Sequence, residues 1–388
     1  MRFAFLGSDE QTLAIAQHLA KDPRHDLTWM CEVGAAAAAQ LRAWAPDIRV
    51  APHWESLVGG AEADVVVVAR SDNDDDRAEQ LRKLVQGETP LVISQPINGS
   101  MLIYYELDMI RREIGSVMLP YTPDRWHPGL EKLQAVLRRD AGSDIGEISQ
   151  VVFERTLADR SRGKVEAQFA RDAAVIRALC GDLTSISAMG PPGDPASVYA
   201  NLGVQLAGPG GRLVRWSVGP IEQTASGRLT LVGAEGKATL HLPSSGEASE
   251  LEIVRGGAKE NISLSAWSPP AAALEQLELA LDRKPATPSW PDACRDIELT
   301  ESIARSLLKG RTIELHNEEH SEHGTFKGTM TSLGCGLLWL SLLVFVVALV
   351  LAWATGAEIF RYAPHFILAV LALFLAIQSL KLVFRSDE

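Results

Sequence analysis

Cysteine is scarce in this sequence, since only four cysteines occur among 388 residues. They are Cys31, Cys180, Cys294 and Cys335, and none stands at a spacing typical of a disulfide framework or a metal site. An excess of basic residues is also missing: 37 lysines and arginines face 49 acidic residues, and the formal net charge is -12. We therefore expect free thiols and no nucleic-acid partner, because an acidic chain has no general attraction to phosphate backbones.

A secretory signal is missing as well. The segment from Met1 to Gly7 has too short an apolar stretch and no small-residue cleavage site. This pattern predicts that the N-terminus stays in the cytoplasm.

Two long apolar runs are present near the end of the chain. They span Thr331 to Ala354 and Pro364 to Val383, and the first has no charge over about twenty-four positions. At about 1.5 Å per residue such a helix crosses about 30 Å of hydrocarbon. We predict a transmembrane hairpin over residues 331-384, preceded by a polar juxtamembrane linker over 316-330. The alternative is a buried helical pair, but soluble core helices are rarely apolar on every face.

The basic residues around the hairpin predict its orientation. The segment that connects the two runs has only Arg361, whereas the outer flanks carry Lys309, Arg311, Lys327, Lys381 and Arg385. Lysine and arginine favour the cytoplasmic side of a membrane. We expect the protein in the inner (cytoplasmic) membrane, with the soluble body and both termini facing the cytoplasm.

The first 120 residues have the pattern of an α/β fold. An apolar strand, a tight turn and an amphipathic helix open the chain, and nearly continuous apolar runs start at Asp64 and Pro90. Such runs are typical of parallel strands that are covered on both faces. Residues 1-120 therefore predict an open α/β domain with a parallel doubly wound sheet, whose ligands lie at the carboxyl ends of the strands.

After Gly142 the pattern changes to strands with short turns, which favours antiparallel pairing. Two helical patterns interrupt these strands, one closed by Gly181 and the other by Gly310. Residues 121-315 thus predict an α+β domain with a mostly antiparallel sheet.

Six segments in this order resemble the glucose-fructose oxidoreductase and inositol dehydrogenase family, often called Gfo/Idh/MocA. They are DVVVVA, PLVISQPI, DRWHPGLEKL, DIGEISQVVFE, RLTLVGAEGKATLHLP and ATPSWPDACRDIELTESIARSLLKGRTIEL. The resemblance covers about residues 1 to 315. It implies that residues 1-120 are a Rossmann domain that binds NAD or NADP, and that a C-terminal sheet roofs the active site and pairs subunits into a homodimer.

The sequence departs from the family at the phosphate loop. A dinucleotide fingerprint needs three glycines, but only Gly7 is present, Asp9 and Thr12 replace the other two, and Glu10 adds a second carboxylate at the helix start. Carboxylates there stabilise the helix and disfavour a bound anion. If a cofactor binds, the resemblance places it on Gly7, Ser8, Glu32, Ala69, Gln95 and Pro96. Glu32 is either the acceptor of ribose hydroxyls or an ordinary exposed residue after a strand.

The family's catalytic positions are also changed. The resemblance places its lysine on Gln95, its acid on Ala167 and its histidine on Arg171. Glutamine is not a cationic proton donor, and no histidine occurs between residues 150 and 200. Arg171 and Asp172 either line a pocket or are surface charges at a helix start.

Candidate ligand contacts lie before the second domain. Arg125, Trp126 and His127 are placed to contact a sugar-like or anionic ligand, or they form a turn stiffened by Pro123 and Pro128 with Trp126 in the core.

The juxtamembrane linker carries three histidines, and a helix would bring His316 and His320 to one face, as a metal site needs. The third is His323. We expect a solvated segment there and no metal.

Two functions remain open. The first is a catalytically degenerate, membrane-anchored binding or scaffold protein. The second is an active NAD(P)-dependent oxidoreductase on a sugar or cyclitol, with catalytic groups relocated to residues such as Arg171 or His127.

Overall fold

The computed structural model describes residues 1–59, 63–71, 74–97, 100–139, 145–191, 198–199, 201–208, 211–219, 226–242 and 249–315. The predicted hairpin over 331–384, the linker over 316–330 and the three linker histidines lie outside this set. No helix in the described ranges has the length and apolarity to cross a membrane. The hairpin therefore stays a prediction.

Six parallel strands form the first sheet, in the order β3-β2-β1-β4-β5-β6. This is the strand order of a doubly wound fold, as the sequence predicts. The strands are β1 (Arg2–Leu6), β2 (Asp26–Cys31), β3 (Arg49–Val50), β4 (Val65–Val68), β5 (Leu91–Ser94) and β6 (Met118–Tyr121). Their carboxyl ends bring Gly7, Ala69 and Gln95 to one edge.

Helices cover both faces of this sheet because successive side chains point to opposite sides. Phe3 and Phe5 of β1 are buried in one cluster with α1 (Glu10–Leu19), α2 (Ala35–Trp44) and α7 (Pro269–Leu281). Ala4 and Leu6 are buried in a second cluster with α3 (Asp74–Gln86), α4 (Met101–Ile114) and the first turns of α8 (Trp290–Lys309). Between β3 and β4 lies the short helix η1 (Trp54–Leu57).

The second sheet has nine strands, in the order β14-β13-β12-β11-β7-β10-β9-β8-β15. Only β7 and β10 run parallel among its recorded pairs, so the sheet is mixed and mostly antiparallel, as predicted. The strands are β7 (Ile148–Thr156), β8 (Ser185–Met189), β9 (Gly203–Ala207), β10 (Leu213–Val218), β11 (Ser226–Gly233), β12 (Gly236–Leu242), β13 (Glu250–Arg255), β14 (Ala258–Ser263) and β15 (Ile313–Glu314).

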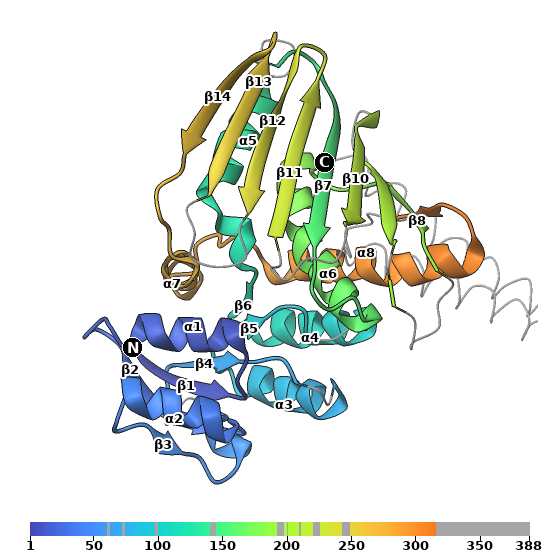
Figure 1. The fold of residues 1–388 in the computed structure, drawn as a ribbon. Coiled ribbons are helices and arrows are strands. Elements are labelled where there is room, and N and C mark those ends of the chain that lie inside the picture. Colours follow the sequence, from blue (N-terminus) through green and yellow to red (C-terminus); the bar gives the residue numbers. More distant parts are fainter. Residues whose placement is uncertain are drawn as a thin grey trace, which may run out of the picture. The chain divides into compact units, whose positions relative to one another are not determined.

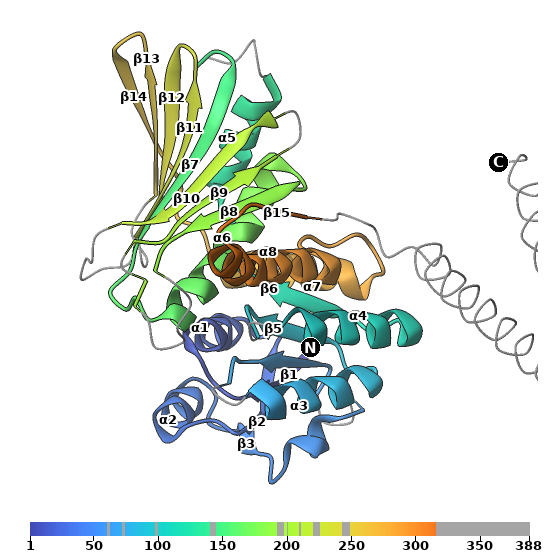
Figure 2. The same cartoon turned by 90° about the vertical axis from the view of Figure 1, so that its right-hand side faces the viewer.

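Three helices cover one face of the nine-stranded sheet: α5 (Pro128–Arg139), α6 (Arg162–Cys180) and α8. The short helix η2 (Pro123–Trp126) leads from β6 into α5. Figures 1 and 2 both show α6 and α8 between the two sheets. The start of α8 is buried with the first sheet, while Leu299 and Ile303 are buried with the second. The predicted boundary at residue 120 stays a prediction, although β6 ends close to it at Tyr121.

Candidate functional site

The turn between β1 and α1 is closed by an internal carboxylate. Gly7 has a φ of 74°, which favours glycine, and Asp9 is the N-cap of α1. Asp9 Oδ1 accepts from the backbone N–H of Thr12 at 2.8 Å, and Oδ2 accepts from the backbone N–H of Arg70 at 3.0 Å. Arg70 Nε also lies 3.4 Å from Oδ2. Burial alone would raise the pKa of Asp9, but these donors outweigh it and hold the pKa below its usual value.

A buried guanidinium lies beside the same turn. Arg77 of α3 is 3% exposed, and its Nη2 would be 2.7 Å from a Cβ added at Gly7. Its Nε and Nη1 have no hydrogen-bond partner, and Nη2 is 3.8 Å from Glu32 Oε2. Burial lowers the pKa of Arg77, and the nearby Glu32 opposes this shift. Arg77 therefore occupies the space directly next to the glycine turn.

Glu32, the predicted ribose acceptor, is held by α3. Its Oε1 accepts from Gln80 Nε2 at 2.7 Å, and its backbone φ is 54°. The structure thus brings Gly7, Ala69 and Glu32 together at one edge of the sheet, with Ser8 half-buried after Gly7. Two α3 side chains, Arg77 and Gln80, lie against this set.

Both ends of the Gln95 side-chain amide are hydrogen-bonded. Tyr104 Oη donates to Gln95 Oε1 at 2.7 Å and accepts from the backbone N–H of Ile97 at 2.8 Å. Gln95 Nε2 donates to the carbonyl of Ile93 at 3.3 Å. The residue is 5% exposed and precedes Pro96 through a cis peptide bond. At the position of the family's lysine, the chain holds a neutral amide in a fixed orientation.

A small cavity of about 10 Å³ adjoins Gln95, enough for about one water molecule. Its lining comes from both halves of the molecule and consists of Gln95, Pro96, Tyr104, Thr122, Ala170, Ala293, Asp296 and Ile297. The hydroxyl of Thr122 is buried there without a hydrogen-bond partner. Burial raises the pKa of Asp296 to about 6, against the opposing effect of Arg177.

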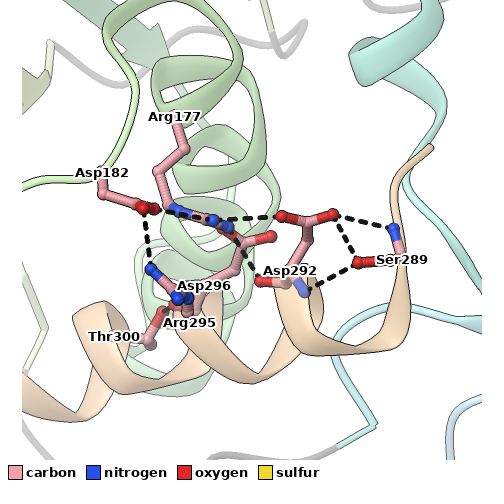
Figure 3. A network of polar contacts seen from close by, with 7 residues as sticks. All are labelled: Arg177, Asp182, Ser289, Asp292, Arg295, Asp296 and Thr300. Atoms are coloured by element: carbon pink, nitrogen blue, oxygen red, sulfur yellow. Dashed lines mark hydrogen bonds and ion pairs between the residues drawn. The ribbon is translucent and has the colours of Figure 1, made fainter. Parts of the chain in front are cut away.

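Asp296 belongs to an ion-pair network between α6 and α8 (Figure 3). Arg177 Nη1 donates to Asp296 Oδ1 at 2.9 Å, and its Nη2 lies 3.1 Å from Asp292 Oδ1. Arg177 also pairs with Asp182, which in turn pairs with Arg295 at 2.8 Å. These contacts join the end of one helix to the start of the other and fix the wall of the cavity.

Arg171 and Asp172 are adjacent in sequence but have different surroundings. Asp172 is fully buried and accepts from Arg155, Gln168 and Trp216. Arg171 is half-buried, and its Nη2 donates to Gln168 Oε1 at 2.7 Å. Burial lowers the pKa of Arg171, and the charge of Arg70 lowers it further. Asp172 thus ties α6 to β7 and β10. Arg171 is instead held by Gln168 of the same helix.

His127 is buried with both ring nitrogens in hydrogen bonds. Nδ1 accepts from the backbone N–H of Gly129 at 3.0 Å, so Nε2 carries the proton toward Ser249 Oγ at 2.8 Å. Trp126 is half-buried and donates to the carbonyl of Thr287 at 2.7 Å. Burial lowers the pKa of Arg125, opposed by Asp292.

Sequence reasoning missed Arg70, Arg77, Tyr104, Thr122 and Asp296. An arginine in an amphipathic helix is usually a solvated surface charge. The sequence therefore did not indicate that Arg77 is buried beside the turn. Asp296 did give one, since Asp292, Asp296 and Thr300 recur every four residues on one face of α8. Among the described residues, no group of three or more His, Cys, Asp or Glu side chains is placed to hold a metal ion.

Comparison with known proteins gives a likeness in structure alone. No family model and no curated protein matches the sequence. An aldose-aldose oxidoreductase from Caulobacter crescentus, complexed with glycerol, matches with a TM-score of 0.67 at 14% identity, over 81% of this chain and 99% of that one. An oxidoreductase from Agrobacterium radiobacter in complex with NAD+, L-tartaric acid and magnesium has a TM-score of 0.66 at 15% identity, over 81% and 98%. Biliverdin reductase from Synechocystis, with biliverdin and NADP+, has a TM-score of 0.60 at 15% identity, over 79% and 98%.

At these identities the likeness shows the fold, which is the one that the resemblance implies. The residues of this chain fit a dinucleotide poorly. In this fold a pyrophosphate lies at the start of the first helix, where it accepts backbone N–H bonds. Here the Asp9 carboxylate accepts the N–H of Thr12, and Arg77 lies against Gly7.

Proposed function

We propose that this chain is a catalytically degenerate relative of the glucose-fructose oxidoreductase and inositol dehydrogenase fold, which acts as a binding or scaffold protein. The observation that carries the proposal is the pair of Gln95 and Tyr104. A neutral amide, held from both ends, replaces the cationic proton donor expected at the end of β5. No histidine of α6 supplies a base in its place.

The test is an assay for turnover. Full-length protein in mild detergent is incubated with NAD+ or NADP+ and a panel of polyols and aldoses, and formation of reduced cofactor is followed. We expect none from the native chain. Gln95→Lys alone should restore nothing, because α6 still lacks a base. Steady formation of NADH or NADPH by the native chain would overturn the proposal.

An active NAD(P)-dependent oxidoreductase on a sugar or cyclitol is the second candidate, and one observation favours it. Asp296 lines the same cavity as Gln95 and has its pKa raised to about 6, as a relocated proton-transfer group would need. In that case Asp296→Asn should abolish turnover while the native chain loses activity only below about pH 6. Turnover that is unchanged in Asp296→Asn would exclude this role.

Membrane anchoring belongs to the same proposal. Its support is the pair of apolar runs from Thr331 and Pro364 and the basic residues that flank them. A reporter fused after Glu388 should be active only if it functions in the cytoplasm. Activity of a reporter that requires export would contradict this orientation.

A homodimer through the nine-stranded sheet completes the proposal. The face opposite α5, α6 and α8 carries Thr230 and Thr239, whose hydroxyls are 3.1 Å apart on neighbouring strands. Light scattering should give a dimer for the native chain and a monomer for Thr230→Arg, which places a charge on this face. A native chain that is strictly monomeric would contradict the proposal.

A further inference from the structure

Backbone N–H groups that could bind an anion lie at the start of α1, and the Asp9 carboxylate already accepts their hydrogen bonds. The backbone N–H groups of Thr12, in the first turn of α1, and of Arg70, just after β4, converge on one carboxylate. We propose that Asp9 is a built-in occupant of a phosphate site, which it keeps closed, and that the site takes phosphate groups once this carboxylate is removed. The inference concerns binding alone and does not depend on the loss of hydride transfer.

The contacts of Asp9 are those that a phosphate oxygen would take. Each of its two oxygens accepts one backbone N–H, at 2.8 and 3.0 Å. The Arg70 guanidinium adds a charged donor at 3.4 Å. Donors arranged in this way at a helix N-terminus bind carboxylate and phosphate alike. A free phosphate therefore competes for these donors with a carboxylate that is covalently attached beside them. The attached carboxylate binds them in preference.

Arg77 is an independent sign of an anion site. Its side chain is 3% exposed, yet two of its three nitrogens, Nε and Nη1, have no hydrogen-bond partner. The guanidinium lies against Gly7, the residue that opens the turn into α1. A buried cation with unsatisfied donors is unfavourable unless an anion is within reach. The negative charges of Glu32 and Asp9 stabilise the charged form of Arg77, but neither carboxylate bonds to these two nitrogens.

Glycine at position 7 allows the Arg77 guanidinium to lie this close to the backbone. A Cβ there would meet Arg77 Nη2 at 2.7 Å and Ala69 Cβ at 3.2 Å. The turn therefore places the Arg77 guanidinium directly against the backbone that leads into α1. Backbone N–H groups and two arginines in this arrangement suit a phosphate or pyrophosphate group.

The test is calorimetric titration of inorganic pyrophosphate into the full-length protein. Asp9→Ser keeps a side chain that caps α1 but removes the carboxylate. We expect no binding to the native chain at millimolar pyrophosphate, and an affinity at least about tenfold higher for Asp9→Ser, as one charge-assisted contact supplies. Asp22→Ser, which removes an equal charge from an exposed turn, should behave as the native chain does.

Each outcome is decisive. Equal affinity of Asp9→Ser and the native chain, with both folded by their melting curves, would overturn the proposal. So would a gain that Asp22→Ser shares, because the effect would then be one of net charge. Adding Arg77→Met to Asp9→Ser should remove the gain, and a gain that persists would show that Arg77 is no part of the site. None of these results depends on turnover, so failure here and failure of the proposed function are separate.

Discussion

Two buried charged side chains, Arg155 and Asp172, form an ion pair between elements that are distant in sequence. Arg155 of β7 pairs with Asp172 of α6 and with Asp124 of η2. Although burial opposes its charge, these two carboxylates raise the pKa of Arg155. The indole N–H of Trp216 completes the coordination of Asp172 at 2.8 Å. Asp172, a candidate site residue by sequence, thus fixes the second sheet against α6.

Asp172→Ala should lower the free energy of unfolding by about 3 kcal/mol, because it leaves a buried arginine with an incomplete set of acceptors. Urea denaturation followed by tryptophan fluorescence measures this change. Asp22→Ala removes a carboxylate from an exposed pair with Arg24 and should cost far less. Equal losses in the two variants would mean that the buried pairing contributes nothing special.

His127 predicts a dependence of stability on pH. Burial lowers its pKa in the folded state, and Asp124 only partly opposes this. The unfolded chain therefore takes up the proton first, and stability falls as the pH drops below about 6.5, the ordinary value for histidine. His127→Gln should make this fall shallower, whereas His53→Gln, at an exposed position, should not. An identical slope in the native chain and His127→Gln would contradict the assignment.

At the scale of elements, local signals in the sequence were reliable. The glycines expected to close two helices are found at their C-caps: Gly181 after α6 and Gly310, in the left-handed region, after α8. The carboxylate expected to stabilise the first helix is its N-cap, Asp9. The alternation of Phe3 and Ala4 determines which helix covers which face of β1.

Local sequence patterns did not show which sheet a late helix packs against. Helical periodicity gives the apolar face of α7 and α8, but it does not name the partner of that face. For this reason the return of α7 and the first turns of α8 to the first sheet could not be read from the sequence. The Asp296 network and the cavity beside Gln95 depend on this return.

Two glycines of the second domain give contrasting predictions. Gly236 begins β12, and a Cβ there would collide with the carbonyl oxygen of Val254. Gly163 is in the first turn of α6, with nothing within 4 Å of a Cβ. Gly236→Ala should therefore lower the melting temperature, while Gly163→Ala should stabilise the protein by about 0.5 kcal/mol or more. Calorimetric melting of both variants decides this, and a loss in Gly163→Ala would contradict the described helix start.

At the scale of the whole molecule, the two sheets of the described residues could be predicted from the sequence. The order of apolar runs and turns gives a parallel sheet followed by a mostly antiparallel one, and the structure has both. For the candidate site, the sequence predicted where some of its residues lie but not the side chains that contact them. Gly7, Glu32 and Gln95 do lie at one sheet edge. Their partners Arg77, Gln80 and Tyr104 come from helices, and nothing in the sequence distinguishes these three from other polar residues of the same helices.

The proposed function requires that the native protein does not bind a dinucleotide at the carboxyl ends of the first sheet. Calorimetric titration of the full-length protein with NADH and NADPH tests it most directly. We expect no binding at millimolar cofactor, because the Asp9 carboxylate already takes the backbone N–H groups of Thr12 and Arg70 beside the start of α1. Micromolar binding of either dinucleotide to the native chain would contradict it.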